Sequence, residues 1–367
     1  MHSGGSFVRL GMFSMPLHPP GRCVADTYRD DFATFELADE LGYEEVWIGE
    51  HFTSIWENIP APDLFIAGAA ARTKRVKFGT GVLLMPFHNP LHAALRLAQL
   101  DHQIEGRLMV GIGSGGIVAD KAVFGIDVTP EEAGKLTREG TEVLVRCWQG
   151  EPFKFEGQYF KLDVPEARAD IQCGTLMRPY QQPHPPIAIA GVNRGSYGLG
   201  QAGERGWIPL STNFLPPNAL ASHWDSYAAG AQRAGRAPDR AIWRIARDVH
   251  VAETTEQARR EAREGAMTAA YRDYMLPLVS QGGRGLGAFK TSVEMPDEAV
   301  TIDYLLDNVW IVGSPDDVAA QLRTVAAEAG GFGTVLQIAF DWYPDQRIFH
   351  RSMELLAKKV MPRLADV

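Results

Sequence analysis

The sequence predicts an α/β protein whose architecture is a (β/α)8 TIM barrel with insertions after strands 4 and 7. Short β-rich runs alternate with helical patterns along almost the whole chain of 367 residues. Some runs, such as residues 187–190, are apolar throughout, as expected for strands that helices cover on both faces. Such a barrel typically takes about 250 residues, and more with insertions. An open, doubly wound parallel sheet is the alternative that the same alternation allows.

The first 150 residues contain four strand-helix units. The helix of the fourth unit has the clearest start, because Thr129 offers a capping hydroxyl and Pro130 fits the first helical turn. We expect strands at residues 7–13, 45–48, 76–84 and 108–112, and helices at residues 27–41, 63–72, 91–105 and 131–148.

The second half repeats this rhythm less regularly. We expect strands at residues 186–190, 207–210, 242–251 and 333–340, a further unit that begins at residues 309–313, and helices at residues 196–205, 217–234, 255–274 and 314–329 before a C-terminal helix. The whole chain, residues 1–367, is therefore expected to form a single barrel domain.

Two segments interrupt the repeat. Aromatic residues around Glu156-Gly157 predict a β-hairpin at residues 153–162, within an insertion near residues 150–185. Residues 277–297 include Gly282-Gly283-Arg284-Gly285, show little periodicity, and form a longer stretch than structureless connections normally do. This second segment is either a surface loop or a mobile lid over the ends of the strands.

Composition narrows the functional class. The chain has 36 Lys and Arg against 45 Asp and Glu, a net charge of −9, and no long basic run, which disfavours a nucleic-acid partner. Its 3 cysteines share no CxxC spacing, which favours a reducing compartment. No apolar stretch approaches the roughly 18 residues of a membrane span, and the first residues lack signal-peptide features. We therefore expect a cytoplasmic protein without a membrane partner.

In barrel enzymes the active site lies at the carboxyl ends of the strands, and His51 directly follows the second strand. An imidazole there can take or give a proton near neutral pH, so His51 is the candidate catalytic residue, with a structural histidine as the alternative. Glu50 either orients it or is an ordinary buried carboxylate. After the third strand, residues 84–90 form a loop with two prolines, which is either the floor beneath a flat aromatic ligand or a rigid turn.

Histidines and glycines mark two further features. His88 and His92 have i,i+4 spacing, but Pro90 separates them at a helix start, so we expect no metal site. Residues 111–116 match GxGxxG but end the fourth strand and continue into a loop-like stretch at 117–129, unlike a dinucleotide-binding turn. The glycines still allow a ligand close to the backbone, and Ser114 adds a hydroxyl.

A candidate anion site follows the predicted strand at residues 186–190. Residues 190–196 lead into a helix there, and Arg194, Gly195 and Ser196 combine a guanidinium, backbone amides and a hydroxyl where a phosphate can bind. Turn chemistry alone is the competing interpretation.

These positions carry a family resemblance over nearly the whole chain. Residues 49–52, 56–60, 80–90, 105–107, 110–116, 190–207 and 312–315 are similar to those of the bacterial-luciferase-like flavin monooxygenases. The most specific part, residues 51–60, resembles the diketocamphane and limonene monooxygenase branch, a likeness that Trp148, residues 151–153 and residues 157–160 extend.

The resemblance implies a two-component monooxygenase that receives reduced FMN from a separate NAD(P)H:flavin reductase and uses O2 to oxygenate a small apolar molecule, such as a cyclic ketone or terpene. It also implies a homodimer. His51 matches a catalytic histidine of the family. The family has an arginine at the end of strand four where this chain has Ser114, which shifts the expected phosphate contact to Arg194, Gly195 and Ser196. The implied contacts are Met85, Ser114, Ala190, Gly191, Arg194, Gly195 and Ser196 for the cofactor and Phe13, Trp56 and Phe87 for the substrate, with no metal ligand.

Two other functions fit the same barrel. The family also contains deazaflavin-dependent hydride-transfer enzymes, and a non-catalytic flavin-binding protein would need no reactive histidine. Oxygenated product formed from reduced FMN and air separates monooxygenation from both.

Overall fold

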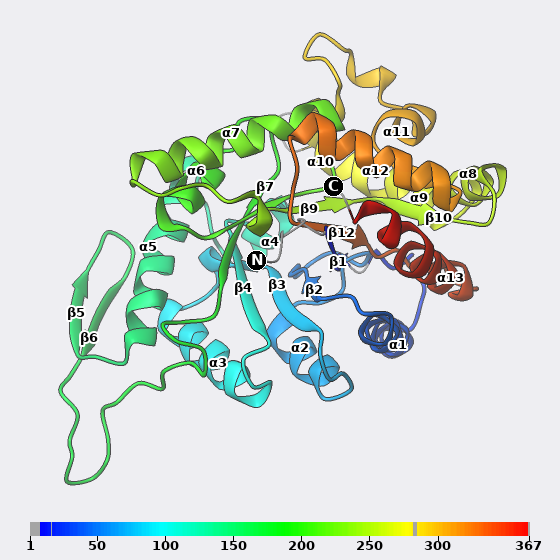
Figure 1. Ribbon diagram of the computed structural model, residues 1–367. Helices are drawn as coiled ribbons and strands as arrows, with labels where there is room; N and C mark the ends of the chain where they lie inside the picture. Colours follow the sequence, from blue (N-terminus) through cyan, green and yellow to red (C-terminus); the bar gives the residue numbers. More distant parts are fainter. Residues whose placement is uncertain (1–7, 16, 282–284, 366–367) are drawn as a thin grey trace, which may run out of the picture.

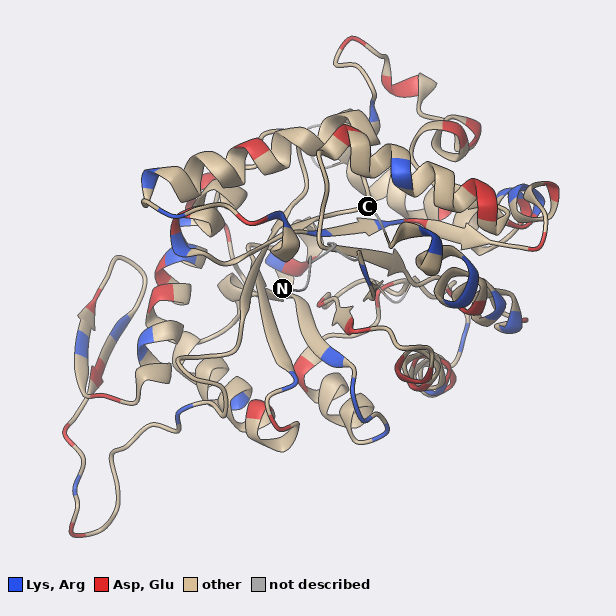
Figure 2. Ribbon diagram, in the orientation of Figure 1, with Lys and Arg blue, Asp and Glu red and all other residues tan. Residues whose placement is uncertain are grey.

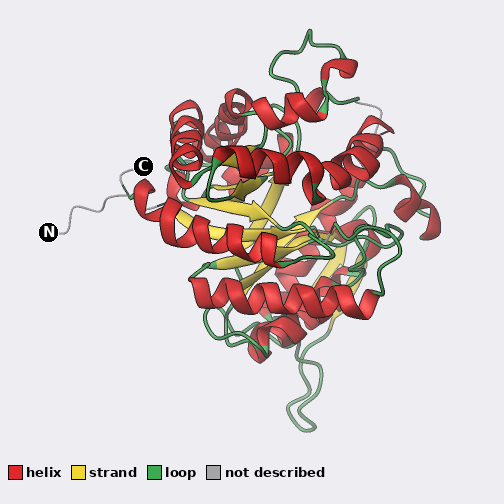
Figure 3. Ribbon diagram, turned by 90° about the vertical axis from the view of Figure 1, so that its right-hand side faces the viewer, coloured by secondary structure: helices red, strands yellow, loops and turns green. Residues whose placement is uncertain are grey.

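The computed structural model describes residues 8–15, 17–281 and 285–365, and its centre is a closed barrel of eight parallel strands surrounded by helices (Figures 1 and 3). The strand order is β1-β12-β9-β8-β7-β4-β3-β2, and β1 pairs with both β12 and β2. This pairing closes the sheet, so the predicted (β/α)8 class is confirmed and an open sheet is excluded. The barrel strands are β1 (Arg9–Ser14), β2 (Glu45–Ile48), β3 (Lys77–Leu84), β4 (Leu108–Gly113), β7 (Ile187–Gly191), β8 (Ile208–Ser211), β9 (Arg244–Arg247) and β12 (Thr334–Ile338).

Several helices begin where the sequence places their caps. Thr129 and Glu132 form a reciprocal capping box at the start of α5, as the Thr129-Pro130 signal indicated. The helices are α1 (Val24–Leu41), α2 (Pro62–Ala70), α3 (Pro90–Gln103), α4 (Val118–Val123), α5 (Pro130–Gln149), α6 (Tyr197–Arg205), α7 (Pro217–Arg233), α8 (Thr255–Glu264), α9 (Ala266–Ala270), α10 (Leu276–Gln281), α11 (Ile302–Asn308), α12 (Pro315–Ala329) and α13 (Arg347–Leu355).

Three sequence-based expectations need correction, and a fourth lies outside the described residues. The run at 242–251 divides at Asp248 into β9 and β10 (Val249–Val251), and β10 pairs with β11 (Ile311–Gly313) outside the barrel. The helix expected at 255–274 is interrupted at Gly265, whose backbone is extended. The stretch at 117–129 contains the short helix α4 rather than only a loop. Phe7, expected in the first strand, lies outside the described residues.

The connections after β4 and β9 are the long ones. The first holds α4, α5 and the antiparallel hairpin of β5 (Phe153–Glu156) and β6 (Lys161–Val164), which projects beside α5 in Figure 1. The second holds α8 to α12. Within the segment predicted as a loop or lid, residues 277–281 belong to α10, and residues 282–284 lie outside the described residues.

The barrel interior is filled by Trp47 of β2, which is fully buried. A Cβ at Gly79 of β3 would lie 2.3 Å from Cε3 of Trp47, so the indole occupies the space that a side chain there would need. Beside it, Glu45 accepts a hydrogen bond of 3.0 Å from the indole nitrogen and pairs with Arg244 of β9 through two contacts of 3.1 Å. The ion pair joins two strands that are not neighbours in the barrel.

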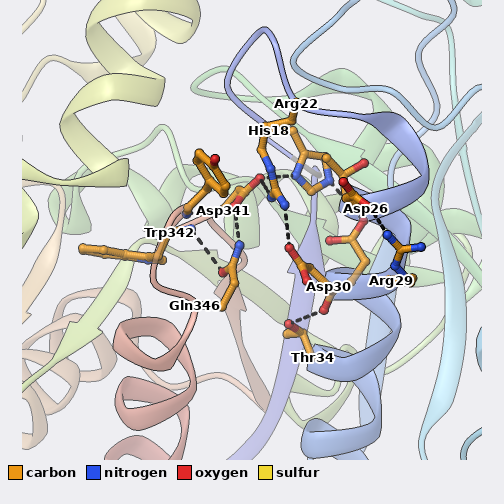
Figure 4. A network of polar contacts seen from close by, with 12 residues as sticks. His18, Arg22, Asp26, Arg29, Asp30, Thr34, Asp341, Trp342 and Gln346 are labelled. Atoms are coloured by element: carbon orange, nitrogen blue, oxygen red, sulfur yellow. Dashed lines mark hydrogen bonds and ion pairs between the residues drawn. The ribbon is translucent and has the colours of Figure 1, made fainter.

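A polar network fastens the first strand connection to the last (Figure 4). His18 contacts Asp341 through Nδ1 at 2.6 Å and Asp31 of α1 through Nε2 at 3.1 Å. Arg22 pairs with both Asp341 and Asp30. The segments after β1 and β12 are therefore held together by buried ion pairs.

Charged residues of both signs are interspersed along the outer helices (Figure 2). Such mixed charge is typical of solvated helix faces. Among the helices of the described residues, none combines the length and the apolar character needed to cross a bilayer.

Candidate active site

A cleft of about 660 Å³ opens at the end of the barrel where the carboxyl ends of the strands meet. This volume falls in the range of small-molecule sites, and the position is the one that barrel enzymes use. Residues at or directly after seven of the eight barrel strands line the cleft, namely Phe13, His51, Leu84, Gly113, Ala190, Thr212 and Ile338.

The structure brings together some of the residues that the sequence singled out and leaves others outside the cleft wall. Of the predicted set, the residues that line the cleft are Phe13, His51, Ser114, Ala190 and Ser196. The residues of that set that do not line it are Trp56, Met85, Phe87, Gly191, Arg194 and Gly195.

Aromatic and apolar members of the second group pack against protein instead. Trp56 stacks on Tyr274 with ring centroids 5.8 Å apart. Phe87 packs edge to face against Phe52 at 5.1 Å. Met85 is fully buried beneath α5.

The predicted anion loop is also engaged by protein. Arg194 donates to the carbonyl oxygens of Lys290 at 2.7 Å and Thr291 at 3.3 Å. The amide of Gly195 donates to Oγ of Ser222 at 3.3 Å. The guanidinium therefore links two segments of the chain. Of this loop, the residues that line the cleft are Ala190, Val192, Asn193 and Ser196.

His51 lies between two carboxylates. Its Nδ1 is 3.4 Å from Oδ2 of Asp120 in α4, and its Nε2 is 3.5 Å from Oε2 of Glu57. Burial alone would lower the pKa of His51, but the negative charges of Glu57 and Asp120 outweigh it and raise the pKa. A raised pKa favours the protonated imidazole, which can donate a proton and places a positive charge at the cleft.

Each carboxylate is itself held in place. Asp120 accepts from the backbone N–H of Thr53 at 2.9 Å and from its hydroxyl at 2.5 Å. The hydroxyl of Tyr274 donates to Glu57, and Ser54 donates to that hydroxyl at 2.9 Å. The orientation of His51 is therefore set by α4, by the segment after β2 and by the helical segment Tyr271–Met275 that carries Tyr274.

Glu50, the other expected partner of His51, has different contacts. It accepts from the backbone N–H of Leu84 at 2.6 Å and lies 2.9 Å from Nε2 of His88. Its carboxylate thus joins the second and third strand ends. In the part of the chain that the structure describes, no group of three or more His, Cys, Asp or Glu side chains is arranged to hold a metal ion.

Sequence reasoning missed one wall of the cleft. A single face of α5 lines it with Pro130, Ala133, Gly134, Thr137, Arg138 and Thr141. These positions follow the i, i+3, i+4, i+7 spacing of one helical face, so the pattern was visible in the sequence. The pattern of cleft-facing residues was not recognised, because the apolar residues on the core face of α5 recur with the same helical period.

Arg138 is the basic residue on that face best suited to an anion. It is half-buried, and among the described residues no hydrogen bond or ion pair engages its guanidinium. A Cβ at neighbouring Gly134 would meet only Nη1 of Arg138, at 3.7 Å, so the helix surface is open beside it. Ser196, Tyr197 and Gly198 line the cleft at the start of α6, where backbone N–H groups lack helical partners. This donor set fits a phosphate group such as that of FMN.

The family model for luciferase-like monooxygenases matches residues 8–332. The chain is 32% identical to 3,6-diketocamphane 1,6-monooxygenase of Pseudomonas putida, over 97% of this chain and 98% of that protein. It is 35% identical to 4-hydroxyprotoasukamycin monooxygenase of Streptomyces nodosus subsp. asukaensis (97% and 92% covered) and 31% identical to limonene 1,2-monooxygenase of Rhodococcus erythropolis (97% and 86% covered).

A solved structure supports the same family assignment. The oxygenating constituent of 3,6-diketocamphane monooxygenase of Pseudomonas putida, a type II Baeyer-Villiger monooxygenase in complex with FMN, superposes with a TM-score of 0.89 at 31% identity, covering 97% of this chain and 98% of that one. The resemblance expected from residues 51–60 is confirmed. The chain therefore belongs to the luciferase-like monooxygenase family and is a flavin-dependent monooxygenase.

Proposed function

We propose that this protein uses reduced FMN and O2 to insert one oxygen atom into a small, largely apolar organic molecule, such as a cyclic ketone or a terpene. The observation that carries the proposal is one cleft that combines apolar walls, the charged pair of His51 and Glu57, and Arg138, whose guanidinium no described residue engages. Relatives named for diketocamphane and limonene support a terpene-like substrate.

Reduced FMN, when bound here, would supply the two electrons that, with two protons, convert O2 into one oxygen atom in the substrate and one in water. In this chain, Arg138 and the first backbone N–H groups of α6 would hold the phosphate. Gly113 and Gly115 would let the cofactor approach the end of β4, while Phe13 and Ile338 would exclude water from the reacting centre. His51 holds the proton that the reaction requires.

The same proposal includes a second protein. The solved relative is described as the oxygenating constituent of its enzyme, which supports a separate NAD(P)H:flavin reductase here as well. We also propose a cytoplasmic homodimer, in line with the family resemblance.

Described parts of the 277–297 segment form a wall of the cleft, through Leu278, Val279, Gly285 and Ala288. Closure of that segment over a ligand stays a prediction.

The test supplies the purified chain with NADH, FMN and a general flavin reductase, together with a panel of cyclic ketones, terpenes and small aromatics. We expect one oxygen atom from labelled O2 in the product of at least one panel member. Consumption of O2 that yields only hydrogen peroxide with every member, while FMN binds, would contradict the proposed reaction.

A further inference from the structure

Asn213 occupies the wall of the cleft in the connection after β8, and a buried carboxyl lies directly behind it. Its amide nitrogen is 3.0 Å from each carboxylate oxygen of Asp248 and 3.0 Å from the hydroxyl of Tyr271. The hydroxyl of Tyr271 in turn donates to Asp248 at 2.8 Å. Asp248 and Tyr271 are fully buried, and Asn213 is half-buried.

These contacts fix which end of the amide faces the protein. The Asn213 side chain has two N–H donors and one carbonyl acceptor. The groups behind it are a carboxylate and a hydroxyl whose own proton goes to that carboxylate, so both present lone pairs. Turning the amide over would set its oxygen against the carboxylate, which is unfavourable.

The oxygen of the amide is then the atom left for a ligand. Among the described residues, none donates to Oδ1 of Asn213, and this atom is not among the buried polar atoms that lack a partner, so it remains accessible. Phe214, the next residue, and Met275, one helical turn beyond Tyr271, also line the cleft and are apolar. The acceptor therefore stands in a wall that otherwise makes few hydrogen bonds.

We propose that Asn213, held by Asp248 and Tyr271, is a specificity-determining residue that accepts a hydrogen bond from an N–H or O–H group of the bound ligand. A ligand with a donor at this point gains a hydrogen bond, whereas a ligand with a carbonyl or hydrocarbon there leaves the amide oxygen unpaired. The donor belongs either to the flavin ring, through its imide N–H, or to a hydroxyl of the organic substrate. This inference rests on the proposed function for its ligand class.

Two ligand pairs separate these sources. The first pair is FMN and N3-methyl-FMN, which lacks the imide N–H. The second is borneol and camphor, a bicyclic alcohol and its ketone, each titrated in the presence of FMN. Binding is measured at pH 8, above the pKa of about 6 to which burial raises Asp248, so that the carboxylate is ionised.

We expect the donor-bearing member of one pair to bind about tenfold or more tightly than its partner, and the pair that shows this preference identifies the source. The preference should be lost in Asn213→Ala and reduced severalfold in Asp248→Asn, which keeps the shape but lets the amide turn. Asn308→Ala, on the exposed face of α11, is the matched control and should keep the preference.

Equal binding within both pairs in the wild-type protein would overturn the inference, and so would a preference that survives in Asn213→Ala. Circular dichroism establishes that each variant is folded, and Tyr271→Phe replaces Asp248→Asn if the latter does not fold. Because the readout is binding, this result is independent of turnover. If oxygenated product forms but neither ligand pair shows a donor preference, only the proposed role of Asn213 is refuted. If a donor preference is seen but no product forms, only the proposed reaction is refuted.

Discussion

The guanidinium of Arg194 donates a hydrogen bond of 2.7 Å to the carbonyl oxygen of Lys290. Asn218 of α7 donates to the next carbonyl, that of Thr291, at 3.0 Å. The backbone at residues 290–291 is thus tied to the connection after β7 and to α7. Arg194 serves this link, whereas no residue that the structure describes engages the donors of Arg138.

This difference predicts which arginine recognises the cofactor phosphate. Arg138→Ala should weaken FMN binding by about tenfold or more, because a charge-assisted hydrogen bond contributes about 1.5–3 kcal/mol. Binding of riboflavin, which lacks the phosphate, should change little. Fluorescence titration of both flavins measures the effect, with Arg194→Ala as the matched variant. If Arg194→Ala abolishes the preference for FMN over riboflavin and Arg138→Ala keeps it, the phosphate binds at residues 194–196 as the sequence first indicated.

His51 should govern product formation more than folding. Its side chain forms part of the cleft wall, so His51→Ala enlarges the cleft rather than leaving a closed cavity in the core. General acid-base groups typically contribute about 10²–10⁴-fold to rate, and we expect a loss of that order with increased hydrogen peroxide and nearly unchanged FMN affinity. His92→Ala, at an exposed position of α3, is the control. Full coupling in a folded His51→Ala variant would show that the histidine is structural.

Asp120→Asn tests the charge beside His51 separately from its shape. An asparagine still accepts from Thr53 but no longer favours the imidazolium, so the pKa of His51 should fall. If the protonated histidine is the working form, product formation declines as pH rises through this pKa. The decline should therefore begin at lower pH in the variant. A pH profile of product formation that is superimposable on that of the wild type would argue against a proton-donating His51.

The barrel was predictable from the sequence because its strands and helices differ in period and in length. Residues 187–190 are apolar throughout, and Thr129-Pro130 marks a helix start, both of which depend on local chemistry alone. The run at 242–251 was not predictable as two strands. Its second part, β10, pairs with β11, a strand from a distant part of the chain that local sequence does not reveal.

Site residues could be predicted from the sequence only where they directly follow a barrel strand. His51 and Ser196 reach the cleft because they follow barrel strands. Arg194 also follows a strand, but the partner that turns it away, Lys290, is 96 positions further along the chain. Asp120 was missed because the sequence around α4 has no helical period long enough to detect.

His18 should make stability fall at alkaline pH. Burial lowers its pKa, but ion pairs with Asp31 and Asp341 outweigh burial and raise the pKa to about 9 from 6.5. The folded state thus binds this proton more tightly than the unfolded state. The stabilisation is complete below pH 6.5 and is lost as pH rises to about 9. Thermal unfolding between pH 6 and 9.5 should show a steeper decline in the wild type than in His18→Gln, and parallel curves would contradict the role of this proton.

Glu45 should be the most sensitive charged position of the barrel interior. Its carboxylate, buried with Arg244 and Trp47, compensates a cation that has left water. Glu45→Gln leaves that guanidinium unpaired and should lower the free energy of unfolding by about 3–5 kcal/mol. Because the loss comes from an uncompensated charge, the double variant Glu45→Gln with Arg244→Met should recover a large part of it. Urea unfolding measures the three proteins, and a double variant less stable than Glu45→Gln would show that Arg244 contributes through its packing rather than its charge.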